Sequence, residues 1–94
     1  MIPPSLPTNV RELREYIKTK SQVRIQHIMK LAGVSDEEAT LLLLRYKKKY
    51  NVEKVAYLKN TNISSVSRKC SRGMKQLLDF INFCSKFEQN LDIF

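Results

Sequence analysis

The sequence has few of the residues that break regular structure and few of those that carry most catalytic chemistry. Two glycines and three prolines occur among 94 residues, and all three prolines lie in the first seven positions. There is one histidine, His27, and there is no glycine-rich phosphate loop, H-E-x-x-H motif or pair of carboxylates at catalytic spacing. We therefore expect a protein that is not an enzyme and that needs no cofactor.

Metal sites, disulfides and membrane spans are equally unsupported. Cys70 and Cys84 form no C-x-x-C pair and have no histidine beside them, which argues against zinc. Both fall on one expected helix or its approach, where a disulfide is awkward. No stretch approaches the roughly 18 unbroken apolar residues of a membrane-spanning helix, and residues 1–7 lack the basic start of a secretory signal. We expect a soluble cytoplasmic protein with two reduced thiols and no membrane partner.

Positive charge is what the sequence has in excess. The net charge is +8, and ten basic residues between positions 45 and 75 are opposed by one acid, Glu53. These basic residues are Arg45, Lys47, Lys48, Lys49, Lys54, Lys59, Arg68, Lys69, Arg72 and Lys75. Residues 76–94 reverse the balance, with three acids against one lysine. A sustained positive field attracts polyanions, so we predict a polyanion-binding face in the middle of the chain. An ordinary solvated face is the alternative for the lysine run at 47–49.

The length and the 43% of apolar residues fit one small domain that begins with two short helices. Asn9 can cap a helix over about residues 10–19, with Glu12 three positions on. Ser21 offers the next cap, and apolar residues at helical spacing continue up to Gly33, a residue suited to a left-handed helix end.

A third helix has the clearest local signal in the chain. Ser35 and Glu38 have the spacing of a capping box, in which each side chain satisfies the other's exposed amide. We expect this helix to continue to about Tyr50. Its apolar side is expected to consist of Ala39, Leu42, Leu43, Tyr46 and Tyr50.

The segment after Asn51 predicts a β-hairpin. Residues 52–58 are rich in β-prone side chains, residues 60–62 offer a turn, and Ile63 and Val66 suggest a second short strand. We therefore place a hairpin at about residues 52–67.

The last segment predicts a helix from about Ser71 to Leu91 with two apolar stripes. One follows Met74, Leu77, Ile81, Cys84 and Leu91, and the other follows Phe80, Phe83 and Phe87. So small a domain cannot bury both stripes against its own core, so we predict a two-fold homodimer through this helix. The predicted interface is Met74, Leu77, Ile81, Cys84, Phe87 and Leu91. Which stripe forms it stays open, and a helix buried on all sides of a monomer is the alternative.

The pattern over residues 25–42 resembles a helix-turn-helix unit. Its apolar positions are Ile28, Ala32, Val34, Ala39 and Leu42. Gly33 lies at the tight turn and Ser35 opens the recognition helix. The pattern departs at Met29, where the family usually carries a small residue that lets the two helices approach closely.

With the hairpin as a wing, the chain resembles the winged-helix class with an appended dimerisation helix, as in PadR-like regulators. In size and composition it is similar to small DNA-binding proteins of archaeal plasmids and viruses. The resemblance implies a mainly α fold with a small β-hairpin, a winged helix-turn-helix in the order α-α-α-β-β-α. We place an extended arm at residues 1–9, the DNA-binding domain at 10–70 and the dimerisation helix at 71–94, packed on the same domain.

The resemblance also implies a function. We expect a site-specific binder of double-stranded DNA, acting at a plasmid partition site or as a transcriptional regulator, with the nucleoid or a plasmid as its place and a further partition or regulatory protein as a partner. The alternative is an adaptor that docks its apolar C-terminal helix into another protein. RNA binding is disfavoured because we expect the four tyrosines in the core rather than on a stacking surface.

The predicted DNA contacts fall into two sets. Base contacts are assigned to the outer face of the third helix, at Thr40, Leu41, Leu44, Arg45 and Lys48, with the guanidinium of Arg45 as the candidate for a bidentate guanine contact. Core positions are the alternative for the two leucines. Phosphate contacts are assigned to Ser21, Gln22, Arg24, Lys47, Lys49, Lys54, Lys59, Arg68 and Lys69.

Overall fold

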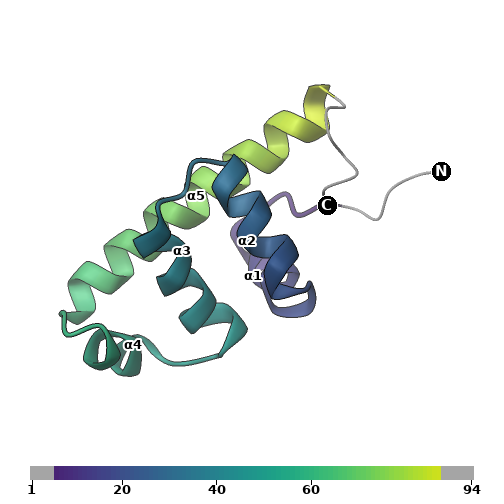
Figure 1. Cartoon of the computed structure of the whole chain (residues 1–94). Helices are drawn as coiled ribbons and strands as arrows, with labels where there is room; N and C mark the ends of the chain where they lie inside the picture. Colours follow the sequence, from purple (N-terminus) through teal and green to yellow (C-terminus); the bar gives the residue numbers. More distant parts are fainter. Residues whose placement is uncertain (1–5, 88–94) are drawn as a thin grey trace.

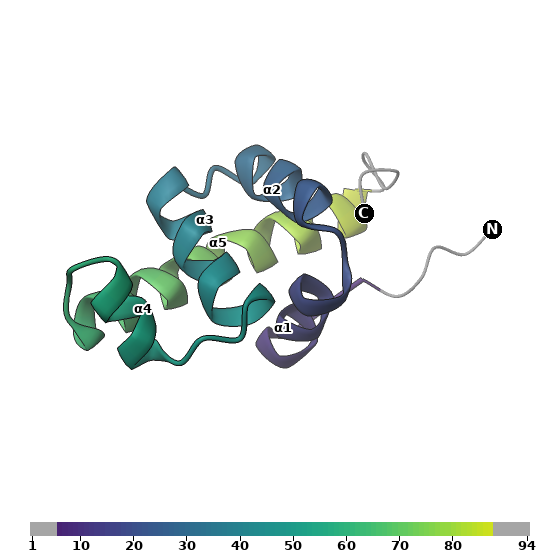
Figure 2. The ribbon, with the colours of Figure 1, turned by 60° about the horizontal axis from the view of Figure 1, so that its bottom comes forward.

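The computed structural model describes residues 6–87, Phe87 by its backbone, and in this range every regular element is helical. The elements are α1 (Val10–Thr19), α2 (Gln22–Leu31), α3 (Asp36–Leu42), the π-helical turn η1 (Leu43–Lys47), α4 (Val52–Leu58) and α5 (Ile63–Phe87). With 25 residues, α5 is about 37 Å long. It runs along one side of the molecule, and α3 lies on it between α2 and α4 (Figures 1 and 2).

The predicted starts of the first three helices are confirmed. The Asn9 side chain accepts a hydrogen bond from the Glu12 amide at 2.9 Å, and Ser21 caps α2 in the same way. At the start of α3, Ser35 Oγ accepts from the Glu38 amide at 3.1 Å, while Glu38 Oε1 accepts from the Ser35 amide at 3.3 Å. Each cap satisfies amides that the first helical turn leaves without a partner.

Two glycines set how the helices meet. Gly33 has a φ of +82°, as predicted for a left-handed helix end, and Gln76 of α5 donates to its carbonyl at 2.8 Å. Gly73 of α5 faces α3, where a Cβ would lie 3.0 Å from Leu42 Cδ1. The missing side chain at Gly73 therefore allows α3 and α5 to pack closely.

The third helix does not continue regularly to Tyr50 as predicted. After Leu42 the chain adds one π-helical turn, and Lys49 then adopts a φ of +63°, which ends the helical path. The π turn shifts the helical register, and helices lie on several sides of this segment. Leu41, Leu42 and Leu43 are all buried; because Leu41 and Leu42 precede the π turn, packing against other helices rather than the register shift buries these two.

The predicted β-hairpin is wrong, because residues 52–67 form α4, a turn and the start of α5. Asn51 caps α4 through the Lys54 amide at 2.8 Å, and Asn62 accepts from the Ser65 amide at 2.7 Å at the start of α5. Tertiary burial of Val55, Ala56 and Val66 outweighs the β preference of the individual residues. Residues 6–87 are helical in every regular element and contain no wing, which does not fit the winged-helix class or the order α-α-α-β-β-α.

The core draws on every helix, and it also takes the stripe that was assigned to a dimer interface. Met74, Leu77, Ile81 and Cys84 are at most 3% exposed within the single chain, so they offer no free surface to a second copy. The other predicted interface residues lie beyond the described side chains, at Phe87 and Leu91. The predicted boundary between residues 70 and 71 falls inside α5. Of the predicted arm, residues 1–5 lie outside the described range, and Leu6 packs against the core.

Both cysteines are free thiols in this core. They lie 14 positions apart on α5, which corresponds to about 21 Å along the helix, too far for a disulfide. Burial raises the pKa of the Cys70 thiol, which the nearby Arg45 lowers to a smaller extent. Burial also raises the pKa of Cys84. Both side chains therefore act as small apolar core residues in the neutral thiol form.

Candidate nucleic-acid interface

The predicted base-contacting residues do not share an exposed face. Leu41 is 2% exposed and Leu44 is half-buried against the core, so the alternative assignment to the core holds for Leu41 and in part for Leu44. The Thr40 hydroxyl donates to the Asp36 carbonyl at 2.8 Å. Arg45 donates from Nη1 to the Tyr50 carbonyl at 2.9 Å. Lys48 alone is fully at the surface.

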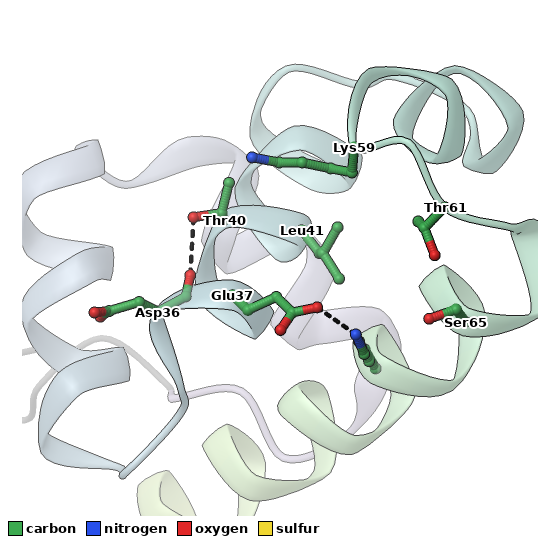
Figure 3. A pocket seen from close by; sticks show the side chains of 8 residues that line it. Asp36, Glu37, Thr40, Leu41, Lys59, Thr61 and Ser65 are labelled. Atoms are coloured by element: carbon green, nitrogen blue, oxygen red, sulfur yellow. Dashed lines mark hydrogen bonds and ion pairs between the residues drawn. The ribbon is translucent and has the colours of Figure 1, made fainter.

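The outer edge of α3 is acidic rather than basic. Asp36 and Glu37 are its exposed residues, and Thr40 beside them is half-buried. The turn between α4 and α5 lies beside Leu41 (Figure 3). It therefore occupies the space that a major groove would need if α3 were a recognition helix. The outer edge of α3 carries no basic side chain, and the turn between α4 and α5 covers Leu41, so α3 is poorly placed to lie deep in a DNA groove.

Basic residues converge instead where the end of α1 meets the end of η1. The Lys47 ammonium donates to the carbonyl of Lys18 at 3.2 Å and also to that of Lys20, so the last turn of α1 and the end of η1 are in contact. Lys48 and Lys49 follow directly and are exposed. We call Lys18, Lys20, Lys47, Lys48 and Lys49 the lysine cluster. The two segments that meet here, residues 16–20 and 43–52, contain no acidic residue, but Glu15 and Glu53 adjoin them. Lys20 also shares a hollow with Glu12 and Glu15.

Aromatic rings support the cations around this cluster. The guanidinium carbons of Arg14 and Arg45 lie 5.6 and 5.3 Å from the centre of the Tyr46 ring. The Lys54 ammonium lies 4.0 Å from the centre of the Tyr50 ring. Such contacts stabilise a cation by about 0.5–1 kcal/mol at exposed sites. They therefore help to hold several positive charges close together.

The sequence missed two members of this cluster. Lys18 and Lys20 are ordinary basic residues at the end of the first helix, and nothing local marks them as binding residues. Their neighbours in the cluster are 27 or more positions away, and the packing of α1 on η1 brings them together. Long-range packing of this kind has no signal in a single sequence.

The other predicted phosphate contacts are scattered. The Ser21 side chain caps α2 through the Arg24 amide, whereas Gln22 and Arg24 are exposed in its first turn. Arg68 lies on the outer face of α5, and Lys69 pairs with Glu37 of α3. On the same helix, Arg72 lies 3.8 Å from Glu38 Oε2, an atom that is buried without a hydrogen-bond partner in the described part of the chain. The basic residues of α5 thus partly serve to tie α5 to α3.

A groove lies between α3 and the turn that joins α4 to α5 (Figure 3). It has a volume of about 400 Å³ and is lined by Asp36, Glu37, Thr40, Leu41, Lys59, Thr61, Ser65 and Lys69. Lys59 reaches across its mouth toward Thr40. The hydrogen bond from Lys69 holds the pKa of Glu37 below its ordinary value, and Lys59 adds a smaller effect in the same direction.

Two structural tests limit the kinds of site. Within residues 6–87, no group of three or more histidine, cysteine or acidic side chains is arranged to hold a metal ion. Among the helices that the structure describes, none has both the length and the apolar character that crossing a bilayer requires.

Comparisons with known proteins add no relative. The chain matches no family model, and neither the curated proteins nor the solved structures give a match.

Proposed function

We propose that this protein binds duplex DNA through its phosphate backbone, with the lysine cluster as the main contact. The observation that carries the proposal is the contact of Lys47 with the carbonyls of Lys18 and Lys20, which brings together two segments that hold five lysines and no acidic residue. Bringing like charges together costs free energy in the isolated protein. A polyanion that lies against the cluster offsets this cost and releases its own counterions.

Contacts of this kind position a protein on DNA without reading sequence. The acidic outer edge of α3 and the burial of Leu41 give no support to base recognition by that helix. Binding of this protein is therefore expected to depend strongly on salt and weakly on sequence.

A duplex fits the surface better than a single strand. Single-strand binding relies on aromatic rings on which successive bases stack. Tyr16, Tyr46 and Tyr50 are half-buried, and Tyr57 is the one tyrosine with a largely exposed ring, at 85%. The expectation that all four tyrosines lie in the core is therefore wrong for Tyr57, but one ring does not make a stacking platform.

The adaptor alternative has less support. It requires an apolar surface on the last helix, and of the two predicted stripes the one with Met74, Leu77, Ile81 and Cys84 belongs to the core of this chain.

The test is fluorescence anisotropy with a labelled duplex of mixed sequence across a salt series, with single-stranded DNA and RNA as competitors. The double variant Lys18→Gln and Lys48→Gln removes two exposed charges from the cluster. Its slope of log affinity against log salt should be shallower than that of the native protein by about 1.8.

The matched control is Arg11→Gln with Lys30→Gln, which removes the same charge from exposed positions outside the cluster. An equal change of slope in both double variants would reduce the effect to net charge and remove the cluster from the proposal. Absence of salt-dependent duplex binding in the native protein would overturn the proposed function itself.

A further inference from the structure

We propose that the groove between α3 and the α4–α5 turn is a binding site for a phosphate group, separate from the lysine cluster. Its volume of about 400 Å³ lies within the range of about 300–1,000 Å³ that is usual for small-molecule sites. The groove is therefore large enough to admit a phosphate with the sugar attached to it.

The positive side of the groove is made by two lysines from different elements. Lys59 follows α4 and reaches across the mouth (Figure 3). Lys69 comes from the second turn of α5. Glu37 pairs with Lys69 and so neutralises one of the two charges. The Asp36 carboxylate points away from Thr61 and Ser65. Lys59 thus remains as a cation without an ion-pair partner among the described residues that line the groove.

Hydroxyl groups complete the site on the side of α5. Thr61 and Ser65 flank the first residue of that helix, and both line the groove. The amide of Ser65 is already bonded to Asn62 at 2.7 Å, but its hydroxyl makes no such cap. Lysine ammoniums together with serine and threonine hydroxyls are typical donors to phosphate oxygens. Leu41 forms an apolar floor below them.

Glu37 would compete with a bound phosphate for Lys69. Its carboxylate holds Lys69, the same donor that an incoming phosphate would use. Removing the charge of Glu37 should therefore strengthen phosphate binding, although Glu37 is itself one of the residues that line the groove. An increase in phosphate affinity after removal of the Glu37 charge distinguishes a phosphate site from a groove whose charges serve only to join α3 to α5.

The experiment is a titration of the native protein with inorganic phosphate, followed by amide chemical shifts at constant ionic strength. Saturable shifts should be centred on residues 59–65. Ser65→Ala leaves the net charge unchanged and should weaken binding about tenfold, as expected for loss of one hydrogen bond to a charged group. Ser64→Ala, an exposed neighbour that does not line the groove, should leave affinity unchanged.

Charge variants test the competitor. Glu37→Gln should tighten phosphate binding several-fold, while Glu53→Gln, the same change on the exposed side of α4, should not. Shifts spread evenly over the basic surface, or equal effects of Ser65→Ala and Ser64→Ala, would overturn the phosphate site.

A second titration identifies the source of the phosphate, and only this step rests on the proposed function. If Ser65→Ala also weakens duplex binding, the groove holds a backbone phosphate of DNA. If it weakens inorganic phosphate alone, the groove serves free phosphate monoesters. The lysine cluster variant tests duplex binding, and the titration with inorganic phosphate tests the groove. Neither result depends on the other, so the two proposals can fail separately.

Discussion

The guanidinium of Arg45 donates a hydrogen bond to the backbone carbonyl of Tyr50 at 2.9 Å and so closes the segment between η1 and α4. The same guanidinium stacks near the ring of Tyr46. We expect Arg45→Ala to lower the free energy of unfolding by about 1–2 kcal/mol, because a partly buried carbonyl loses a charged donor and a cation–π contact is removed. Urea denaturation followed by circular dichroism measures this change.

Two variants bracket the effect of Arg45. Lys48→Ala, an exposed neighbour, should change stability by no more than about 0.5 kcal/mol. Arg45→Lys keeps the charge but loses the planar donor, so its loss of stability should lie between those of Lys48→Ala and Arg45→Ala. Unchanged stability of Arg45→Ala, together with a lost preference among duplex sequences, would restore Arg45 to the base-reading role that the sequence suggested.

Gly73 is the position where a small change should test the packing of α3 on α5. Alanine gains about 1 kcal/mol over glycine in a helix, but its Cβ would lie 3.0 Å from Cδ1 of the fully buried Leu42. Overpacking costs about 1–3 kcal/mol, so Gly73→Ala should lower the free energy of unfolding by about 1 kcal/mol.

Gly73→Val should lower the free energy of unfolding further than Gly73→Ala, since two further methyl groups would press against α3. Ser71→Ala, on the exposed side of α5, serves as the control and should be neutral or slightly stabilising in the same thermal or urea melts. A stabilised Gly73→Ala would mean that Leu42 moves aside and that the close approach of the helices does not depend on the glycine.

The sequence predicts the parts of this fold that are decided locally. Asn9, Ser21, Gly33 and the pair Ser35 and Glu38 each act on the amides or carbonyls of their own helix end, so their roles follow from residue type and spacing. Such signals need no knowledge of the rest of the chain.

The β-hairpin failed because β preference is a weak guide when burial is decided elsewhere. Val52, Val55 and Ala56 also have helical spacing, and Asn51 and Asn62 are good helix caps. The sequence of this segment was therefore also compatible with helices. The π turn had no such signal, and the packing of the α4–α5 turn beside Leu41, which removes that residue from the predicted base-reading face, had none either. The predicted base contacts depended on that face, whereas the lysine cluster depends on the packing of α1 on η1.

The homodimer stays a prediction, but the predicted interface has to be replaced by another surface of α5, because most of its residues are buried. Because Met74 and Ile81 are core residues, a second copy would have to contact the large apolar side chains that are exposed on the described part of α5, which are Phe83 at 52% and Ile63 at 46%. We expect Phe83→Ser to shift sedimentation velocity or light scattering toward the monomer. Tyr57→Ser, which removes an exposed aromatic ring from α4, should not. A native protein that stays monomeric at several hundred micromolar would remove the dimer from consideration.

Stability should fall in acid, through carboxylates whose pKa values are lowered by hydrogen bonds. The Thr8 amide and hydroxyl donate to Glu12 at 2.8 and 2.9 Å and hold its pKa below the ordinary value of 4.5, and Lys69 does the same for Glu37. A lowered folded-state pKa means that the unfolded chain binds more protons. The stabilisation is therefore complete above pH 4.5 and is lost as the pH falls through the lowered values.

Glu12→Gln isolates one of these groups. The variant should be less stable than the native protein at pH 7, and the difference should shrink as the pH falls below 4.5, because protonation then removes the same charge from the native protein. Glu15→Gln, an exposed neighbour on α1, is the control with the same loss of charge. A difference between native protein and Glu12→Gln that stays constant from pH 7 to pH 3 would show that the Thr8 hydrogen bonds do not depend on the charge of the carboxylate.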